Sequence, residues 1–146
     1  GETFLLSYGI DKEAMKKIID WNSGMDSIDM PDSVDSIFTK IPYVHLEFLE
    51  HTSSYYETEN FFFSHAGVAK GIELNKQAFS ALVWGDNRCL NDNTDYGKML
   101  IFGHWHNDGP IIGYRRIGIA RKNDVAVLDL SNMVITDSKG NTRQLG

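Results

Sequence analysis

The chain has 146 residues, 42% hydrophobic and 23% charged, a composition typical of a folded globular protein and not of a disordered one. Fourteen Lys and Arg against twenty Asp and Glu leave a net charge of −6, which argues against an extended nucleic-acid-binding surface. No apolar run approaches the ~20 residues that span a bilayer, and the single cysteine, Cys89, excludes an internal disulfide. These features predict a cytoplasmic protein without membrane contact.

The N-terminal region is predicted to contain a strand, a helix and a loop. Residues 3–8 form a continuous apolar run closed by Gly9, a pattern that indicates a buried strand. Asp11 is a suitable N-cap for a helix over 12–21, where apolar residues recur at helical spacing. Residues 22–35 are rich in Ser, Asp and Gly and predict a loop.

A second helix is expected to begin at Pro42, because proline suits the first turn of a helix. Four apolar residues would line its buried side: Val44, Leu46, Phe48 and Leu49. Extended segments are expected next at 55–58 and at 60–63, of which the second carries three phenylalanines. The three phenylalanines are interpreted as core beneath the loop that follows them.

The remaining elements are a helix at 75–83, a strand at 98–102 and several strands after Ile111. The chain should end in a hairpin whose turn lies at 137–141. Helices dominate the first half and strands the second. This order predicts an α/β or α+β fold that is not doubly wound. The strands at 61–63, at 98–102 and after 111 are expected to form one sheet of a β-sandwich, flanked by the helices at 12–21 and 75–83.

Three histidines directly follow predicted strands. His65 comes after 61–63, and His104 and His106 come after 98–102. Strand ends in α/β sheets are where ligand crevices form, and residues two apart in extended backbone point to the same face. Together the three imidazoles are a plausible ligand set for a transition metal, although ordinary hydrogen-bonded histidines are the alternative. His45 and His51 lack such a pattern and are expected on a helix surface.

Three motifs, in this order, resemble the calcineurin-like metallophosphoesterases: Phe-Ser-His-Ala-Gly-Val at 63–68, Leu-Val-Trp at 82–84 and Ile-Phe-Gly-His at 101–104. The nearest branch comprises the bacterial and phage serine/threonine protein phosphatases and their diadenosine-tetraphosphatase relatives. Residues 3–9 and 44–59 are also similar to stretches of these enzymes. The resemblance extends from residue 3 to about residue 106, and residues 111–146 fit only loosely.

The resemblance implies a four-layer α/β/β/α sandwich, of which residues 1–146 would form the C-terminal part of a single domain. It also implies two divalent metal ions, Mn, Fe or Zn, bridged by an aspartate. His65 and His104 correspond to ligands of the second metal and His106 to a ligand of the first. Protein phosphatases often lack the histidine at the position of His106, so this residue departs from the nearer branch.

A substrate-binding arginine is also implied, because related phosphatases place one shortly after a similar tryptophan to bind the phosphoryl group. Here the candidate is Arg88, four residues after Trp84. The alternative is a surface arginine paired with Asp86 or Asp92. Two weaker candidates lie on a late strand: Arg115 and Arg116.

The N-terminal motifs of the family, Asp-x-His, Gly-Asp-x-x-Asp and Gly-Asn-His, are absent from this sequence. Residues 85–89 begin like the second motif, but Cys89 stands where its last aspartate is required, and the segment follows His65 instead of preceding it. Cys89 itself has no neighbouring His or Lys to activate it, and Ser64 lacks a base, so neither is expected to be a nucleophile. The chain begins with Gly1, which predicts a processed, tagged or longer parent protein.

These considerations predict a hydrolase of the metallophosphoesterase class, and more narrowly a serine/threonine protein phosphatase, in the intact protein. Its substrate would be a phosphorylated protein or a small phosphoester such as a bis-nucleoside polyphosphate. Three neutral imidazoles lack the carboxylates and the bridging ligand that two ions need, so this chain alone is expected to be inactive and its catalytic residues stay unknown. The missing N-terminal part would be its partner. The alternative is a non-catalytic binding module derived from a phosphatase fold.

Overall fold

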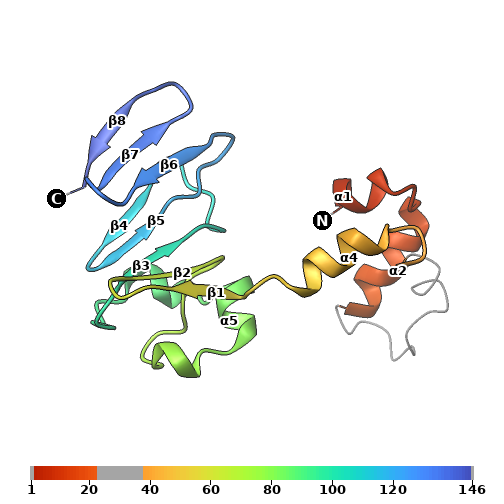
Figure 1. The fold of residues 1–146 in the computed structure, drawn as a ribbon, viewed down its shortest axis with the longest axis horizontal. Coiled ribbons are helices and arrows are strands. Elements are labelled where there is room, and N and C mark those ends of the chain that lie inside the picture. The colour runs from red at the N-terminus through yellow and green to blue at the C-terminus, as the bar shows by residue number, and fades with distance from the viewer. Residues whose placement is uncertain (1, 23–37, 146) are drawn as a thin grey trace. The chain divides into compact units, whose positions relative to one another are not determined.

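The computed structural model describes residues 2–22 and 38–145 (Figure 1). The chain divides into two compact units, Gly1–Thr52 and Ser53–Gly146. The first unit contains α1 (Glu2–Ser7), α2 (Lys12–Asn22) and α4 (Tyr43–Glu50). The second contains all eight described strands. Among the described residues, none belongs to a helix with the length and hydropathy needed to cross a membrane.

The strand predicted at 3–8 is wrong, because residues 3–7 belong to helix α1 and Tyr8 lies in the turn after it. A continuous apolar run does not distinguish a strand from a buried helix. Here Leu5 and Tyr8 pack against a small core of Ile10 and Met15. Gly9, at a φ of 72°, ends the helix in the left-handed conformation that glycine adopts readily.

The helix predicted at 12–21 is confirmed as α2, and Asp11 caps it, since its Oδ1 accepts a hydrogen bond of 2.8 Å from the Ala14 N–H. Apart from Asn22, which ends α2, the loop predicted at 22–35 lies outside the described residues. The helix after Pro42 is confirmed as α4, but its predicted buried side is wrong. Leu46 is half-buried, and three residues are exposed: Val44, Phe48 and Leu49. The reason is that the described core of this unit forms around Ile10 and Met15, with no apolar residue of α4 in it.

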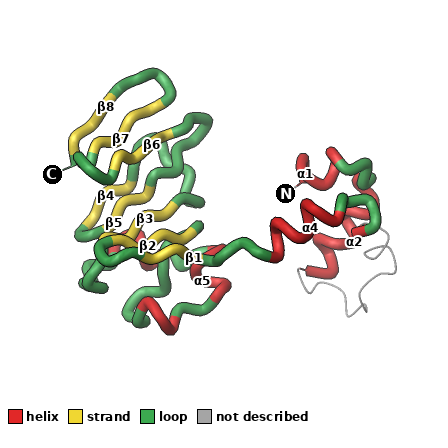
Figure 2. Tube along the Cα trace, viewed as in Figure 1, coloured by secondary structure: helices red, strands yellow, loops and turns green. Residues whose placement is uncertain are grey.

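The second unit is built on a five-stranded mixed sheet, drawn in yellow in Figure 2, with the order β1-β2-β3-β5-β4. The strands are β1 (Tyr55–Glu57), β2 (Phe61–Ser64), β3 (Met99–Phe102), β4 (Ile111–Gly113) and β5 (Arg116–Gly118). The inner strands β2, β3 and β5 are parallel, whereas β1 and β4 pair antiparallel at the edges. The extended segments predicted at 55–58, 60–63 and 98–102 are therefore confirmed.

A second, antiparallel sheet contains β6 (Ala126–Asp129), β7 (Val134–Asp137) and β8 (Thr142–Gln144). The predicted hairpin turn at 137–141 is confirmed, and the Asp137 N–H donates to the Asn141 carbonyl at 3.0 Å. The expectation of one sheet for all strands after 111 is wrong, because β4 and β5 join the first sheet and β6 to β8 form the second. The reason is that Ile135 of β7 and Leu145, which follows β8, pack in an apolar core against the first sheet. The second sheet therefore covers a face of the first sheet and does not extend its edge.

The two faces of the first sheet bury different residues, as alternation along a strand requires. On one face Phe62 and Leu100 pack with Val68 and Leu82. On the other face Ile101 and Ile117 pack with Ile135 of the second sheet and with Leu145, and Phe61 and Phe63 join this cluster. The phenylalanine run thus contributes to both cores, as predicted for a buried strand. The fold is mixed α/β.

The helix predicted at 75–83 is interrupted. A 3-10 turn, η1 (Leu74–Lys76), is followed by extended backbone at Gln77 and Ala78 and then by α5 (Phe79–Trp84). The Gln77 side chain explains the break, because it hydrogen-bonds the N–H and C=O of Ala69 and the carbonyl of Ile72. A second 3-10 turn, η2 (Asn87–Asn91), follows α5. Helix α2, which was expected to flank the sheet, belongs to the first unit.

Candidate metal centre

His65 and His104 are in contact at the ends of two paired strands. Strands β2 and β3 run parallel with Ser64 opposite Phe102, so the residues that follow them emerge at the same edge of the sheet. The Nδ1 atom of His104 lies 3.1 Å from Nε2 of His65, and the two rings meet at 71°. The parallel pairing therefore brings together two imidazoles that are 39 residues apart in sequence.

The separation of the two nitrogens fits two ligands of one ion. Zinc–imidazole bonds are about 2.0–2.1 Å long, so two such nitrogens at an angle between octahedral and tetrahedral are about 2.8–3.4 Å apart. The observed 3.1 Å falls in this interval, and it also suits a hydrogen bond when one ring donates to the other. Within residues 2–22 and 38–145, no group of three or more His, Cys, Asp or Glu side chains is close enough to hold a metal ion.

The backbone at His104 is unusual, with a φ of 60° in the left-handed region. Such a conformation is costly for a residue other than glycine and persists where surrounding contacts enforce it, often at functional sites. Here the Gly103 N–H donates to the His65 carbonyl at 2.9 Å, and the Trp105 N–H donates to the Gly103 carbonyl at 2.6 Å. These bonds hold the His104 ring toward His65.

Besides partial burial, the charge of His106 contributes to the lowered pKa of His65. The pKa of His65 is lowered by partial burial first, and then by the neighbouring charges of His104 and His106. All three causes favour the neutral imidazole, which is the form that binds a metal. Thus His65 and His104 are in contact, whereas His106, exposed on the same loop as His104, does not complete a three-residue metal-binding group with them in the described part of the chain.

The other two histidines belong to the first unit and have partners within it. His45 Nδ1 is 2.6 Å from the Tyr8 hydroxyl, and His51 Nδ1 is 2.7 Å from the Glu47 carbonyl. Both are exposed on or next to α4, as predicted for ordinary helix-surface residues.

The loop after β2 is held by a set of short-range bonds. The Ser64 hydroxyl donates to the Gly67 carbonyl at 2.8 Å and accepts from the Gly67 N–H at 3.1 Å. The Ala66 N–H donates to the Leu82 carbonyl at 2.8 Å, which links this loop to α5. Ser64 therefore positions the loop, and its hydroxyl is already engaged on both sides.

Trp105 is a structural component of the site that the sequence motifs did not single out. Its Nε1 donates to the Ala66 carbonyl at 2.8 Å, and its ring meets that of His104 edge-on with centroids 5.1 Å apart. It also lies against Gly85, where a Cβ atom would come within 2.4 Å of Trp105 Cζ2. The sequence did contain a signal for the role of Trp105, because this residue stands between two candidate ligands, His104 and His106.

Arg88 is exposed and paired with Asp86, the alternative considered for it. Its Nε and Nη2 both donate to the Asp86 carboxylate, the latter at 2.6 Å. The carboxylate also accepts from the Arg88 N–H and so caps η2. The hydrogen bonds from Arg88 hold the pKa of Asp86 below its ordinary value. Asp86 lines a surface hollow together with Trp105, so Arg88 is anchored beside the histidine loop.

The two weaker arginine candidates lie elsewhere. Arg115 pairs with Asp95 and donates to the Gly97 carbonyl, near the start of β3, whereas the histidines follow the end of that strand. Arg116 is only 1% exposed, and its guanidinium donates to the carbonyls of Tyr114 and Cys89. Neither position is suited to a phosphoryl group at the histidines.

Arg116 belongs to a buried polar network. Its Nη2 lies 3.8 Å from the Asp92 carboxylate, too far for a hydrogen bond, and has no hydrogen-bond partner in the described part of the chain. Asp92 accepts from the Thr94 and Tyr96 hydroxyls at 2.6 and 2.7 Å. Cys89 is buried beside this network, and burial raises the pKa of its thiol, which makes a nucleophilic role unfavourable.

Comparison of the chain with protein-family models, with curated proteins and with solved structures finds no match. What the chain does is therefore inferred from its own residues. The most informative of these are His65 and His104, which parallel strands bring into contact.

Proposed function

We propose that this chain is the C-terminal part of a metallophosphoesterase domain, folded in the intact protein as a four-layer α/β/β/α sandwich. In this proposal His65 and His104 bind one divalent ion and His106 contributes to a second. The observation that carries it is the 3.1 Å separation between His65 Nε2 and His104 Nδ1 at neighbouring ends of parallel strands. The order of the motifs around Gly67, Trp84 and Gly103 supports the same family.

The chemistry is hydrolysis of a phosphomonoester, in the narrower proposal one on serine or threonine. A pair of Mn, Fe or Zn ions, when bound, supplies an activated water and takes up charge on the phosphoryl oxygens. The residues of this chain orient the ligands, with the left-handed backbone of His104 and the Trp105 hydrogen bond holding the two rings. No covalent phosphoenzyme is expected, because the Ser64 hydroxyl is occupied and Cys89 is buried.

Arg88 is the proposed phosphate-binding residue. A guanidinium offers paired N–H donors that match two phosphoryl oxygens. Its present partner is the Asp86 carboxylate, and the arginine side chain is 71% exposed. Solvent screens the exposed guanidinium. The Asp86 side chain is only 16% exposed, but its carboxylate keeps the hydrogen bond from the Arg88 backbone N–H after the exchange.

A two-metal site needs more ligands than the three candidate histidines of this chain. Three neutral imidazoles cannot balance the charge of two dications, and they provide no bridging carboxylate. In the proposal these carboxylates come from Asp-x-His, Gly-Asp-x-x-Asp and Gly-Asn-His motifs outside residues 1–146. The isolated chain is therefore expected to bind a single ion weakly and to show no turnover.

The first test is zinc binding to residues 1–146, measured by titration calorimetry. His65→Ala and His104→Ala should each abolish the binding, whereas His51→Ala, a matched exposed histidine outside the cluster, should leave it unchanged. An equal loss in the His51→Ala variant, or retained binding in both of the others, would contradict the proposed ligands.

The second test is hydrolysis. A longer protein that contains this chain and encodes the three motifs in frame should hydrolyse p-nitrophenyl phosphate with Mn and lose nearly all activity on His65→Ala or His104→Ala. Robust hydrolysis by residues 1–146 alone would show that the ligand count is wrong. A parent protein without the motifs, and without activity, would favour the non-catalytic binding module.

A further inference from the structure

A hollow of about 630 Å³ lies beside the candidate metal centre. We call it the indole hollow, and its lining includes Ser80, Trp84, Gly85, Asp86, Asn87 and Trp105. Trp105 forms the wall shared with the metal centre, since its ring contacts that of His104. The volume is within the range of about 300–1,000 Å³ that is usual for small-molecule sites.

The wall formed by Trp105 is held from two sides. Its Nε1 is bonded to the Ala66 carbonyl, in the loop that carries His65. Its six-membered ring lies where Gly85 leaves space, and Gly85 itself adopts a φ of 87°. The hollow and the histidine pair are therefore built from the same contacts.

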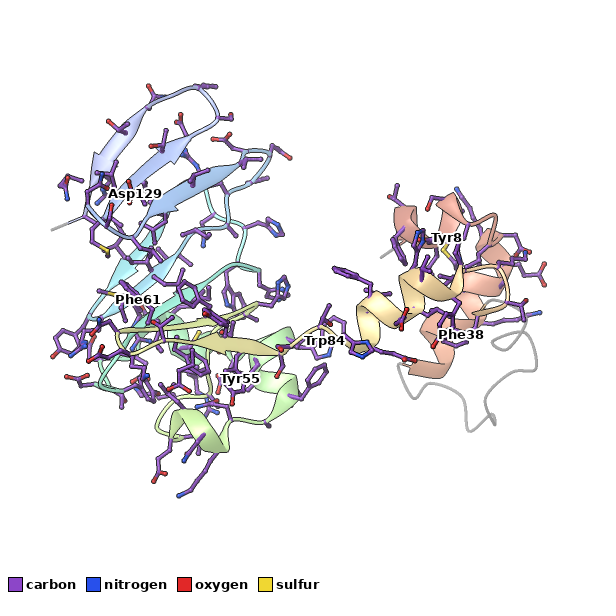
Figure 3. The ribbon with its side chains drawn as sticks, in the orientation of Figure 1. Tyr8, Phe38, Tyr55, Phe61, Trp84 and Asp129 are labelled. Carbon is purple, nitrogen blue, oxygen red and sulfur yellow. The ribbon has the colours of Figure 1, made fainter. Side chains whose placement is uncertain are left out.

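The hollow is also lined by Trp84, at the C-terminal end of α5 (Figure 3). This indole is 67% exposed. An exposed indole offers a face for stacking, and stacking of a nucleic-acid base on an aromatic side chain is among the stronger contacts available to a planar ring. The geometry therefore favours a flat aromatic ligand over an aliphatic one.

The polar groups of the hollow favour a neutral ligand that carries hydrogen-bond donors and acceptors. The side chains of Ser80 and Asn87 make no hydrogen bond to any residue in the described ranges, so the hydroxyl and the amide are available. The one carboxylate of the lining, Asp86, is paired with Arg88.

We propose that the indole hollow binds a nucleobase, so that a nucleotide is bound by its base in the hollow and by its phosphate at the histidines. The base would stack on Trp84, with its polar edge toward Asn87 and Ser80. The assignment of the phosphate rests on the proposed function, whereas the base-binding hollow can be tested with a nucleoside that has no phosphate.

The test uses residues 1–146 and follows the tryptophan indole N–H signals by NMR during titration with adenosine. The signals of Trp84 and Trp105 should shift in a saturable manner. Trp84→Ala should weaken adenosine binding roughly tenfold, and Trp84→Phe should restore part of it because a smaller aromatic face remains. The matched control is Phe79→Ala, on the same helix and 64% exposed but outside the hollow, which should bind as the parent chain does.

Absence of saturable shifts, or unchanged affinity in Trp84→Ala, would overturn the nucleobase site even if zinc binding through His65 persists. A phosphoserine peptide that binds in the presence of zinc while adenosine does not would overturn it in favour of a protein substrate. Adenosine binding that requires Trp84 supports the hollow, and it does so even if His65→Ala shows the metal centre to be wrong. The two proposals therefore fail separately.

Discussion

The Trp105 indole donates a hydrogen bond of 2.8 Å to the carbonyl of Ala66. This bond joins the loop after β2, which carries His65, to the loop after β3, which carries His104. Ala66 is fully buried, so its carbonyl has little access to water. The relative position of the two candidate ligands therefore depends on a residue that is itself not a ligand.

Replacing Trp105 by Phe should destabilise the protein, because the buried Ala66 carbonyl loses its 2.8 Å donor. The Cys89 thiol, a weak donor 3.8 Å away, remains the only partner of this carbonyl among the described residues. A buried acceptor left with no partner costs about 1–3 kcal/mol, so the free energy of unfolding in urea should fall by up to about that amount. Trp84→Phe is the control, since Trp84 is exposed and its change should stay within about 0.5 kcal/mol. Equal effects of the two variants would contradict a structural role for the Trp105 bond.

Gly85→Ala should destabilise the protein more than Gly71→Ala does. Both glycines have positive φ, 87° and 75°, so both variants incur backbone strain, and Gly85, with a ψ of 160°, lies in a region that is essentially restricted to glycine. Only at Gly85 would the new Cβ meet another group, Trp105 Cζ2 at 2.4 Å, whereas nothing lies within 4 Å at Gly71. Urea unfolding should show a loss of about 1 kcal/mol for Gly71→Ala and a larger loss for Gly85→Ala. In the Gly85 variant alone, the indole N–H signal of Trp105 should also move.

Arg116→Met should be strongly destabilising, because it leaves the Asp92 carboxylate buried without its nearby positive charge. Breaking a buried ion pair by removing one partner costs about 3–5 kcal/mol. Arg88→Met removes an arginine whose side chain is 71% exposed and leaves Asp86 with the backbone N–H of residue 88 as donor, so the unfolding free energy should change less. Thermal and urea unfolding of both variants measure the contrast, and similar small losses would mean that Arg116 and Asp92 are not coupled.

Stability should fall in acid partly because of Asp92. Burial raises the pKa of Asp92, but hydrogen bonds from Thr94 and Tyr96 and the charge of Arg116 outweigh it and hold the pKa below the ordinary 3.8. As the pH falls, the Asp92 carboxylate of the unfolded chain therefore binds a proton at a higher pH than that of the folded chain. The stabilisation is complete above the unfolded pKa and is lost as the pH falls from about 4 toward the lower folded value.

Urea unfolding between pH 6 and pH 3 measures this loss. Asp92→Asn has no carboxyl to titrate at this position, so its stability should decline less steeply below pH 4 than that of the parent chain. An identical slope in both proteins would show that Asp92 does not contribute to the acid sensitivity.

His106→Ala should reduce zinc affinity less than His104→Ala does, although the two residues share a loop. The reason is that the nitrogen contact of 3.1 Å involves only His65 and His104, whereas His106 acts on His65 through its charge. Titration calorimetry of residues 1–146 compares the variants directly. A larger loss of zinc affinity in His106→Ala would indicate that the bound zinc ion uses a different pair of histidines.

Much of the candidate site could be predicted from local sequence. The apolar runs ending at Ser64 and Phe102 are short, rich in phenylalanine or aliphatic residues, and closed by glycine-containing turns, so they were predicted as strands with histidines after them. Asp11 and Pro42 likewise mark helix starts that the structure confirms. These features depend on propensities and spacings within a few residues, which a sequence displays directly.

Other features were decided by contacts between distant residues. The apolar run at 3–8 became α1 because Leu5 and Tyr8 pack on Ile10 and Met15, and the predicted helix at 75–83 broke because Gln77 bonds back to Ala69. Nothing in the periodicity of either segment carries this information.

The amino-acid sequence by itself determined which residue types stand at the strand ends, and hence that His65 and His104 were candidate ligands. The parallel pairing of β2 with β3 decided that these two rings meet at 3.1 Å. Tertiary packing also decided that Trp105 fits against Gly85 and that Arg116 is buried with Asp92. The physical reason is that burial and side-chain contact depend on which segments pair and pack, and those segments lie tens of residues apart in the chain.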